Sequence, residues 1–374
     1  MAVSDTQPLS YQLPFQSVNP ADPADVAIAY STGTLVSCYL AVSTNGGSTW
    51  RDIDMVGMGG LFSVPTGGSC PQGGPVEWGP DGTIYYLYTT RTSSFVGMVN
   101  LVVSHNFGQT FSNPILVDPT LPTGWVDFDV TAAVDAHANL PSGKLYVSWG
   151  RFLQSNFLES QLMVASSTND GASLSTPLVT SAAVSDNTNP IVVGPDGTVY
   201  IMYHDYRAQD AFTGGFPLAV IHSSDGGNTW SQPVSLGVGA QNCTPGPPKA
   251  CDNLGGGVAI APGSQPGQVV AAWAAADQDG NLRIFETQST DGGNTWSSPQ
   301  IISNVGALTN DWQFLPELSA APDGTVSLAF YDLVPSSTAP FQTPTGTENT
   351  YLMSSSNLGQ TWSAPLLVSS QASN

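Results

Sequence analysis

The few arginines of this sequence are the side chains best suited to hold a ligand. The chain has 7 lysines and arginines against 28 aspartates and glutamates, so a guanidinium near a loop is unusual. A guanidinium offers a rigid fork of N–H donors that matches a carboxylate or a pair of hydroxyls. Four arginines stand where expected strands end or begin, and they are our candidates for substrate binding: Arg91, Arg151, Arg207 and Arg283.

Carboxylates and aromatic rings accompany these arginines. Two carboxyl groups can serve as acid and base at a glycosidic bond, and an aromatic ring offers a flat apolar face to a sugar. The candidate catalytic residues are Asp205, Glu317 and Tyr331. The further candidates for substrate binding are Asp127, Trp125 and Trp312. Together with the arginines, these residue types suit a glycan site.

The alternative is that the arginines are structural. An arginine at a strand end beside an aspartate forms an ion pair within the fold more often than it clamps a ligand, by roughly two to one. Arg207, for example, could simply pair with Asp205 or with a neighbouring repeat. Replacing Arg207 would then lower thermal stability and leave ligand binding unchanged, whereas a ligand-binding Arg207 would give the reverse.

A sequence motif that occurs six times indicates how these residues are positioned. Its frame is Ser-x-Asp/Asn-x-Gly-x-Thr/Ser followed by an aromatic residue, which is Leu174 in the third copy. The copies occupy residues 43–50, 104–111, 167–174, 223–230, 289–296 and 355–362. The Asp or Asn can bind nearby backbone N–H groups, the Gly supplies a positive φ, and the aromatic ring packs under the turn. A spacing of roughly 60 residues predicts a radial repeat fold.

Each repeat has the same order of expected strands. An apolar first strand leads through a Pro-Asp-Gly turn, or its equivalent, into a second strand rich in β-branched and aromatic residues. A variable loop, a third strand, the repeated turn and a short fourth strand follow. We therefore predict a single all-β domain, a six-bladed β-propeller of four-stranded antiparallel blades, with blades at about 11–72, 73–122, 123–183, 184–240, 241–305 and 306–370.

Strand direction sorts the loops onto two faces. Antiparallel neighbours alternate in direction, so the repeated turns and the Pro-Asp-Gly turns share one face. The other face holds the loops between second and third strands and the links between blades, and variable loops on a rigid scaffold usually carry function. The candidate site residues fall on this loop face, whereas Asp225, in the fourth repeated turn, does not.

The six turns resemble the Asp-boxes, also called bacterial neuraminidase repeats, of sialidases and many relatives. The resemblance covers nearly the whole chain. It implies a sialidase-like propeller, and it is more specific for the fold than for the activity, because one fold hosts many functions.

The same resemblance implies roles for individual residues. Sialidases hold a substrate carboxylate with three arginines, and they use a tyrosine nucleophile paired with a glutamate and an aspartate as acid or base. Arg207 and Arg283 match two of the arginines, Tyr331 matches the tyrosine, and Glu317 or Glu77 matches its partner.

The N-terminal arginine motif of the family, Arg-Ile-Pro or similar, is missing. The first arginine is Arg51, which directly follows the first repeated turn and so lies on the opposite face. Two functions therefore stay open. One is a secreted glycoside hydrolase of sialidase-like architecture. The other is a non-catalytic propeller that binds glycans or another protein in an extracellular assembly.

The amino-acid composition restricts the kinds of partner that the protein can bind. A formal net charge of −21 argues against nucleic acid and against anionic membrane surfaces. No apolar run approaches the length of a membrane span, and the first residues lack the basic start and apolar segment of a signal peptide. We expect no cofactor and no zinc site, although the number of aspartates leaves a bound Ca²⁺ open.

The cysteines favour an extracellular location. Four cysteines allow three pairings. Cys243 and Cys251 bracket a Pro-rich loop and are expected to form a disulfide, and Cys38 and Cys70 are candidates for a second one. Disulfides persist in oxidising compartments. The expected partner there is a carbohydrate or glycoconjugate, with a protein assembly partner as the alternative.

Overall fold

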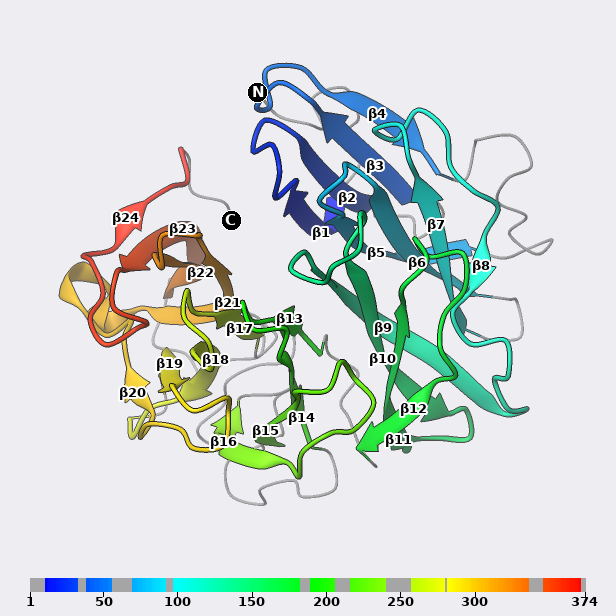
Figure 1. Cartoon of the computed structure of the whole chain (residues 1–374). Coiled ribbons are helices and arrows are strands. Elements are labelled where there is room, and N and C mark those ends of the chain that lie inside the picture. The colour runs from blue at the N-terminus through cyan, green and yellow to red at the C-terminus, as the bar shows by residue number, and fades with distance from the viewer. Residues whose placement is uncertain are drawn as a thin grey trace. The chain divides into compact units, whose positions relative to one another are not determined.

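The computed structural model describes residues 11–32, 38–55, 69–91, 97–181, 189–205, 216–239, 257–279, 281–335 and 346–370. Its strands form six four-stranded sheets, in each of which consecutive strands lie side by side (Figure 1). The chain divides into two compact units, Met1–Ile191 and Val192–Asn374.

The first unit contains three blades. Blade one comprises β1 (Tyr11–Val18), β2 (Val26–Thr32), β3 (Cys38–Ser43) and β4 (Arg51–Asp54). Blade two comprises β5 (Ser69–Trp78), β6 (Ile84–Arg91), β7 (Gly97–Ser104) and β8 (Ile115–Leu116). Blade three comprises β9 (Trp125–Asp135), β10 (Lys144–Leu153), β11 (Asn156–Ser167) and β12 (Leu178–Ser181).

The remaining three blades follow in the same order. Blade four comprises β13 (Ile191–Val193), β14 (Val199–His204), β15 (Phe216–Ser223) and β16 (Val234–Gly239). Blade five comprises β17 (Val258–Pro262), β18 (Val269–Ala276), β19 (Leu282–Ser289) and β20 (Gln300–Ile301). A short 3₁₀ helix, η2 (Gly306–Asn310), leads into blade six, which comprises β21 (Trp312–Ala320), β22 (Val326–Pro335), β23 (Gly346–Ser355) and β24 (Leu366–Leu367).

The core lies between successive blades. In the first unit, one buried cluster joins blades one and two and another joins blades two and three. In the second unit, blades four, five and six are joined in the same way. The second strand of blade five, β18, is buried at every residue but the last. Its sequence is a continuous apolar run rather than an alternating one, because a sheet covers each of its faces.

The six repeated turns share one hydrogen-bond pattern. In the fourth turn, the Ser223 hydroxyl accepts the N–H of Gly227 at 2.9 Å and donates to Asp225 Oδ1 at 2.8 Å. The same Asp225 oxygen accepts the N–H of Thr229 at 2.9 Å. The other five turns repeat all three bonds with Asn or Asp. Hydrogen bonds lower the pKa of Asp225 to about 2, and the one from the Thr229 side chain contributes most.

The predicted fold class is confirmed. Six blades of four antiparallel strands, with almost no helix, make an all-β six-bladed β-propeller. The repeated turns lie between third and fourth strands, at the same end of each blade as the turns between first and second strands. Of the described candidate residues, Trp125, Asp127, Arg151, Asp205, Arg283 and Trp312 lie at or near the other end, whereas Glu317 and Tyr331 lie within β21 and β22. In the described part of the chain, no helix is long and apolar enough to cross a membrane.

Glu286 of β19 departs from the repeat inside this core. It lies three residues before the serine of its repeated turn, and the other five blades have aliphatic residues there: Leu40, Leu101, Val164, Val220 and Leu352. The Glu286 carboxyl is 4% exposed and lies beside Gly359 of blade six. Its Oε1 has no hydrogen-bond partner among the described residues. Burial therefore raises the pKa of Glu286 to about 8.

We expect Glu286→Leu to stabilise the protein, and to do so more strongly as the pH rises. Folded Glu286 keeps its proton up to about pH 8, whereas the group titrates near 4.5 when it is not perturbed. The contribution of Glu286 to stability is fully present below the unfolded-state pKa near 4.5. It is lost as the pH rises toward the folded-state pKa of about 8, at up to about 1.4 kcal/mol per pH unit. Thermal unfolding at several pH values measures this difference.

Glu286→Gln is the matched control, because it keeps the shape and cannot ionise. The wild type should lose stability relative to Glu286→Gln across this pH range. Parallel stability curves for the two proteins would contradict a buried protonated Glu286.

Candidate functional site

Arg151 of β10 lies in a buried polar cluster of the first unit. Its Nε donates to Asp127 Oδ1 at 2.8 Å and its Nη2 donates to Asp127 Oδ2 at 3.0 Å, which makes a two-pronged ion pair with the neighbouring strand β9. Asp118, which follows β8, binds the same Nη2. Arg151 and Asp127 are only 6% and 2% exposed. The cluster thus ties blade two to blade three.

The two carboxyls of this cluster differ in their electrostatics. Burial raises the pKa of Asp127, and the ion pair with Arg151 offsets the effect only in part. Burial also opposes ionisation of Asp118, but hydrogen bonds from Thr120 and Arg151 outweigh it and lower the pKa of Asp118. The predicted ligand-binding residue Trp125 starts β9 and is half-buried. Protein carboxylates occupy the fork of Arg151, and its role in substrate binding stays a prediction.

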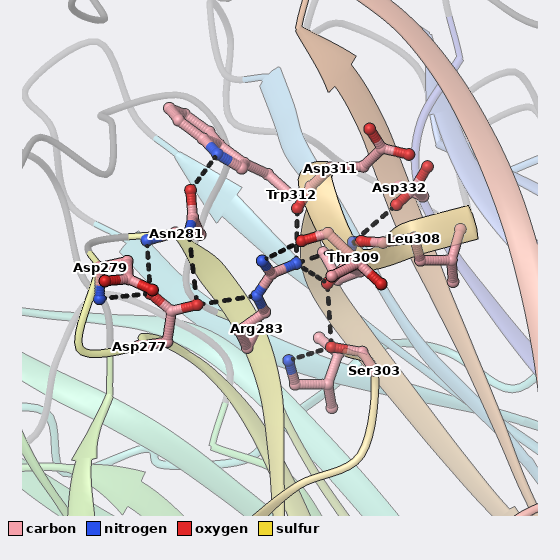
Figure 2. Close-up of polar contacts among 12 residues, drawn as sticks. Asp277, Asp279, Asn281, Arg283, Ser303, Leu308, Thr309, Asp311, Trp312 and Asp332 are labelled. Carbon is pink, nitrogen blue, oxygen red and sulfur yellow. Dashed lines mark hydrogen bonds and ion pairs between the residues drawn. The ribbon is translucent and has the colours of Figure 1, made fainter. Parts of the chain in front are cut away.

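A second cluster surrounds Arg283 at the loop end of blades five and six (Figure 2). Arg283 is 2% exposed, and its guanidinium makes five hydrogen bonds. The acceptors are all protein oxygens: Asp277 Oδ2, Gln313 Oε1 and the backbone carbonyls of Leu308, Thr309 and Asp311. Every nitrogen of the fork is thus engaged within the protein, and a substrate contact by Arg283 stays a prediction.

This network positions the entry to blade six. The carbonyls of Leu308 and Thr309 lie in the last turn of η2, where a cation is favourable, and that of Leu308 also accepts the N–H of Asp311. Trp312, a predicted ligand-binding residue, follows directly and donates its Nε1 to Asn281 Oδ1 at 3.3 Å. Asn281 is held in turn, because its N–H donates to Asp277 Oδ1 at 2.9 Å. Figure 2 shows the indole of Trp312 directed toward Asn281.

Two carboxyls beside the network have raised pKa values. Asp332 of β22 is 1% exposed and accepts Gln313 Nε2 at 2.7 Å, while its Oδ2 has no partner among the described residues. Burial, with a contribution from the charge of Asp311, raises the pKa of Asp332 to about 6. Burial also raises the pKa of Asp311, against the effect of Arg283. Asp332 is covered, so Asp311 is the member of the pair that solvent can reach.

Blade six brings together two predicted catalytic residues. Glu317 of β21 pairs with Ala329 of β22, and Tyr331 follows two residues later. Glu317 and Tyr331 therefore project from one face as diagonal neighbours, about 7–8 Å apart. A bulge at Leu315, whose φ is 48°, sets this register. Tyr331 is 42% exposed and stacks on Phe314 with ring centroids 5.8 Å apart.

Glu317 is accessible yet poorly solvated. Its side chain is exposed on the inner strand of the blade, but the surrounding protein atoms desolvate the carboxyl and raise its pKa. A carboxyl whose pKa is raised holds a proton more readily than a free carboxyl, so Glu317 is a candidate to exchange a proton with the exposed phenol of Tyr331.

Other predicted residues are described only in part. Asp205 follows β14, is half-buried and donates its N–H to the carbonyl of Pro217 at 2.8 Å. Arg207 lies outside the described residues, and so does the side chain of Arg91. Their proposed contacts with substrate stay predictions.

Glu77, the alternative partner for the tyrosine, lies in the first unit. It is near the end of β5 and accepts the Ser17 hydroxyl at 3.2 Å. Burial raises the pKa of Glu77 to about 8. The contact joins the first strands of blades one and two, which explains the position of Glu77 without a substrate.

The described residues include only some of the side chains on which the metal and disulfide expectations depend. Among the described residues, no group of three or more His, Cys, Asp or Glu side chains is arranged to hold a metal ion. Cys243 and Cys251 lie outside the described residues, as does the side chain of Cys70. Cys38 is disulfide-bonded, but its partner is not among the described side chains, so neither predicted pairing is tested. Cys38 is buried in the core of blade one.

Asp332 and Asp118 were not named as catalytic or binding candidates, although Asp332 was expected among the carboxylates of the loop face. The position eight residues after the glycine of the first-to-second-strand turn is Thr90, Arg151, Asp205, Ala275 and Asp332 in blades two to six. An alignment of the repeats would thus have placed Asp332 beside Arg151 and Asp205. Asp118 follows a two-residue strand, and its pairing with Arg151 depends on contact between blades.

Comparisons with known proteins bear on the fold. No family model matches the chain, and no curated protein matches it. Solved structures match over most of it. A Hadza microbial sialidase has a TM-score of 0.50 at 17% identity, over 93% of this chain and 67% of that one. A protein of unknown function from Dyadobacter fermentans has 0.52 at 13% identity, over 92% and 94%.

An α-L-arabinofuranosidase from Fusarium graminearum matches similarly, with a TM-score of 0.52 at 13% identity over 86% of this chain and 88% of that one. The chain has the six-bladed propeller fold of sialidases. Identities this low show the fold alone, because a shared fold does not carry a shared activity.

We expect Arg151→Met to lower the free energy of unfolding by about 3–5 kcal/mol. The substitution leaves Asp118 and Asp127 buried without their cation. Adding Asp118→Asn and Asp127→Asn should restore much of the loss, because neutral amides are cheaper to bury than carboxylates. Chemical denaturation near neutral pH measures all three proteins.

Lys144→Met is the control, since Lys144 starts the same strand and is only half-buried. Its loss should stay within about 1 kcal/mol, as for other surface charges. Equal losses for Arg151→Met and Lys144→Met would show that the cluster does not hold blades two and three together.

Proposed function

We propose that this protein is a secreted propeller that hydrolyses extracellular glycans at the loop face of blade six. The observation that carries the proposal is the pair formed by Glu317 and Tyr331. Both side chains are exposed, they project from one face, and the Glu317 carboxyl has a raised pKa. A phenol beside a proton-accepting carboxyl is an activated nucleophile.

The chemistry would proceed in two steps. The Tyr331 oxygen attacks the anomeric carbon of the sugar and passes its proton to Glu317, while the bond to the leaving-group oxygen breaks. Asp205, at the loop end of blade four, is our candidate for the acid that gives that oxygen a proton. Water then attacks the anomeric carbon and gives a proton to Asp205, the bond to the Tyr331 oxygen breaks, Tyr331 recovers its proton from Glu317, and the sugar is released. The second step mirrors the first.

Support for a glycan as substrate comes from the fold and from the residue types. The matched structures include a sialidase and an arabinofuranosidase, and a further match is described as an ulvan lyase of a polysaccharide lyase family. Trp312, held at the entry to blade six, supplies an aromatic face for a sugar ring. The strongly acidic surface agrees with an extracellular carbohydrate partner rather than a nucleic acid.

A second candidate function is a non-catalytic propeller that binds glycans or an assembly partner. The observation in its favour is that Arg151 and Arg283 are both engaged by protein oxygens. Arg283, one of the two arginines that the resemblance assigns to a carboxylate clamp, is therefore already engaged, and so is the further binding candidate Arg151.

The test is a turnover screen of the purified protein on aryl glycosides, with a sialoside included. We expect hydrolysis of at least one glycoside. Tyr331→Phe and Glu317→Gln should each lower kcat on the order of 10²–10⁴-fold, as for the loss of a positioned proton-transfer group or its nucleophile.

Tyr351→Phe is the matched control. Tyr351 also lies in blade six, where its ring stacks on Phe330 at 6.1 Å instead of joining the Glu317 pair. It should keep activity near the wild-type value. Absence of turnover on every glycoside, with binding to a glycan array intact, would reject the hydrolase and leave the binding propeller.

A further inference from the structure

Arg51 departs from the repeat on the face of the repeated turns. The residue after the aromatic position is a serine in the other five repeats: Ser112, Ser175, Ser231, Ser297 and Ser363. Each of these hydroxyls accepts a backbone N–H of the third strand at 3.0–3.1 Å. The repeated turn thus has a standard closing residue, and an arginine replaces it once.

The side chain of Arg51 reaches from blade one to the second repeated turn. Its Nη2 donates to the carbonyl of Phe107 at 2.6 Å and its Nη1 donates to that of Gly108 at 3.0 Å. Three of the five N–H donors of a guanidinium then remain. Arg51 is exposed, and it has no carboxylate partner among the described residues. In both respects it differs from Arg151 and Arg283.

Phe107 is a second departure at the same place. The corresponding residue has a positive φ in all six turns and is a glycine in three of them: Gly46, Gly226 and Gly292. A bulky residue strains the backbone in this left-handed region. Phe107 adopts it with φ 57° and keeps its ring 40% exposed, 6.0 Å from the ring of Trp78.

The two departures meet at a cavity of about 200 Å³ between the first and second turns. Its walls include two aromatic rings, a cation and three polar side chains: Trp50, Phe107, Arg51, Thr44, Thr49 and Gln109. The Trp50 ring is packed over Gly47, where a Cβ would lie 3.4 Å from it. The cavity is smaller than the roughly 300 Å³ at which pockets for drug-sized ligands begin, so its size fits one sugar ring.

We propose that this cavity binds one carboxylated sugar residue of a glycan. The remaining N–H groups of Arg51 form the fork that a carboxylate fits. Trp50 and Phe107 offer apolar surface to the C–H face of a sugar ring. The threonine hydroxyls and the Gln109 amide can bind the ring hydroxyls.

The net charge of the protein restricts the ligand further. At −21, most of the surface repels polyanions. A single carboxylate held at short range by Arg51 is therefore a better ligand than a densely charged chain.

The next junction along the chain shows that the fold itself does not create this site. Between the second and third turns, the positions of Arg51, Phe107 and Gln109 are occupied by Ser112, Asp170 and Ala172. That junction has a carboxylate in place of the ring and no cation. The site lies on the turn face of the first unit, so it is separate from the reaction proposed for blade six and would retain glycans rather than cleave them.

The test uses methyl β-D-glucuronide as the probe. Saturation-transfer NMR and calorimetric titration measure its binding. Methyl β-D-glucoside is the neutral match. The wild type should bind the glucuronide with a Kd that is roughly millimolar and the glucoside at least about tenfold more weakly. Arg51→Ser installs the residue of the other five repeats, so it should fold, and it should weaken glucuronide binding at least about tenfold.

Two further variants complete the design. Lys144→Ser removes the same charge from blade three and should bind the probe as the wild type does. Tyr331→Phe should also keep binding, and Arg51→Ser should keep any glycosidase turnover. Together these results would separate the cavity from the blade-six site.

Several outcomes would overturn the proposal. Binding kept in Arg51→Ser but lost in Tyr331→Phe would place the probe at blade six. Equal affinities for glucuronide and glucoside would show that Arg51 does not recognise the carboxylate. A lower melting temperature of Arg51→Ser with unchanged binding would leave Arg51 as a tie between two turns, and absence of binding to the wild type at about 20 mM probe would leave no site at all.

Discussion

A blade of this protein is stable only where another sheet covers it. The second strands β6 and β18 show this constraint, because their apolar residues are buried on both faces within their own units. A four-stranded sheet with two apolar faces cannot stand alone in water. Within each unit, each blade must therefore pack against the next. The six turns share one set of hydrogen bonds, so the turn end of every blade is uniform, whereas the loops at the other end vary in length.

The repeat also makes single residues interpretable, because five copies of a position show what the fold needs there. Where one copy departs, the fold does not explain the residue. Glu286 replaces an aliphatic side chain and leaves a buried carboxyl without a partner for Oε1. Arg51 replaces a serine that closes the turn, yet it gains two hydrogen bonds and lines a cavity. The first departure buries an ionisable group and costs stability as the pH rises, whereas the second adds a binding group.

The fold could be predicted from the sequence because its signals are local. Turn chemistry and strand pattern lie within a few residues, and they repeat. The partners of the arginines could not be predicted in this way. Arg283 binds backbone carbonyls of η2, which no side-chain pattern reveals, and Arg151 binds Asp118 from the preceding blade. The pairing of Glu317 with Tyr331 depends on one bulge at Leu315, since a strand without it would turn Glu317 to the other face.

These contacts limit what the loop face of blades five and six can attract. Arg283 is neutralised by Asp277 and surrounded by carbonyl oxygens. Among the described residues, no salt bridge joins Asp311, Asp332 or Glu317 to a cation. A substrate carboxylate brought there would meet like charges, which is costly. Binding of a sialoside at blades five and six therefore requires an arginine other than Arg283. Arg207, which belongs to the same unit, was predicted for this role. A neutral glycoside does not require such an arginine. Turnover of a sialoside would therefore indicate that Arg207 reaches the site, whereas turnover of neutral glycosides alone would indicate that it does not.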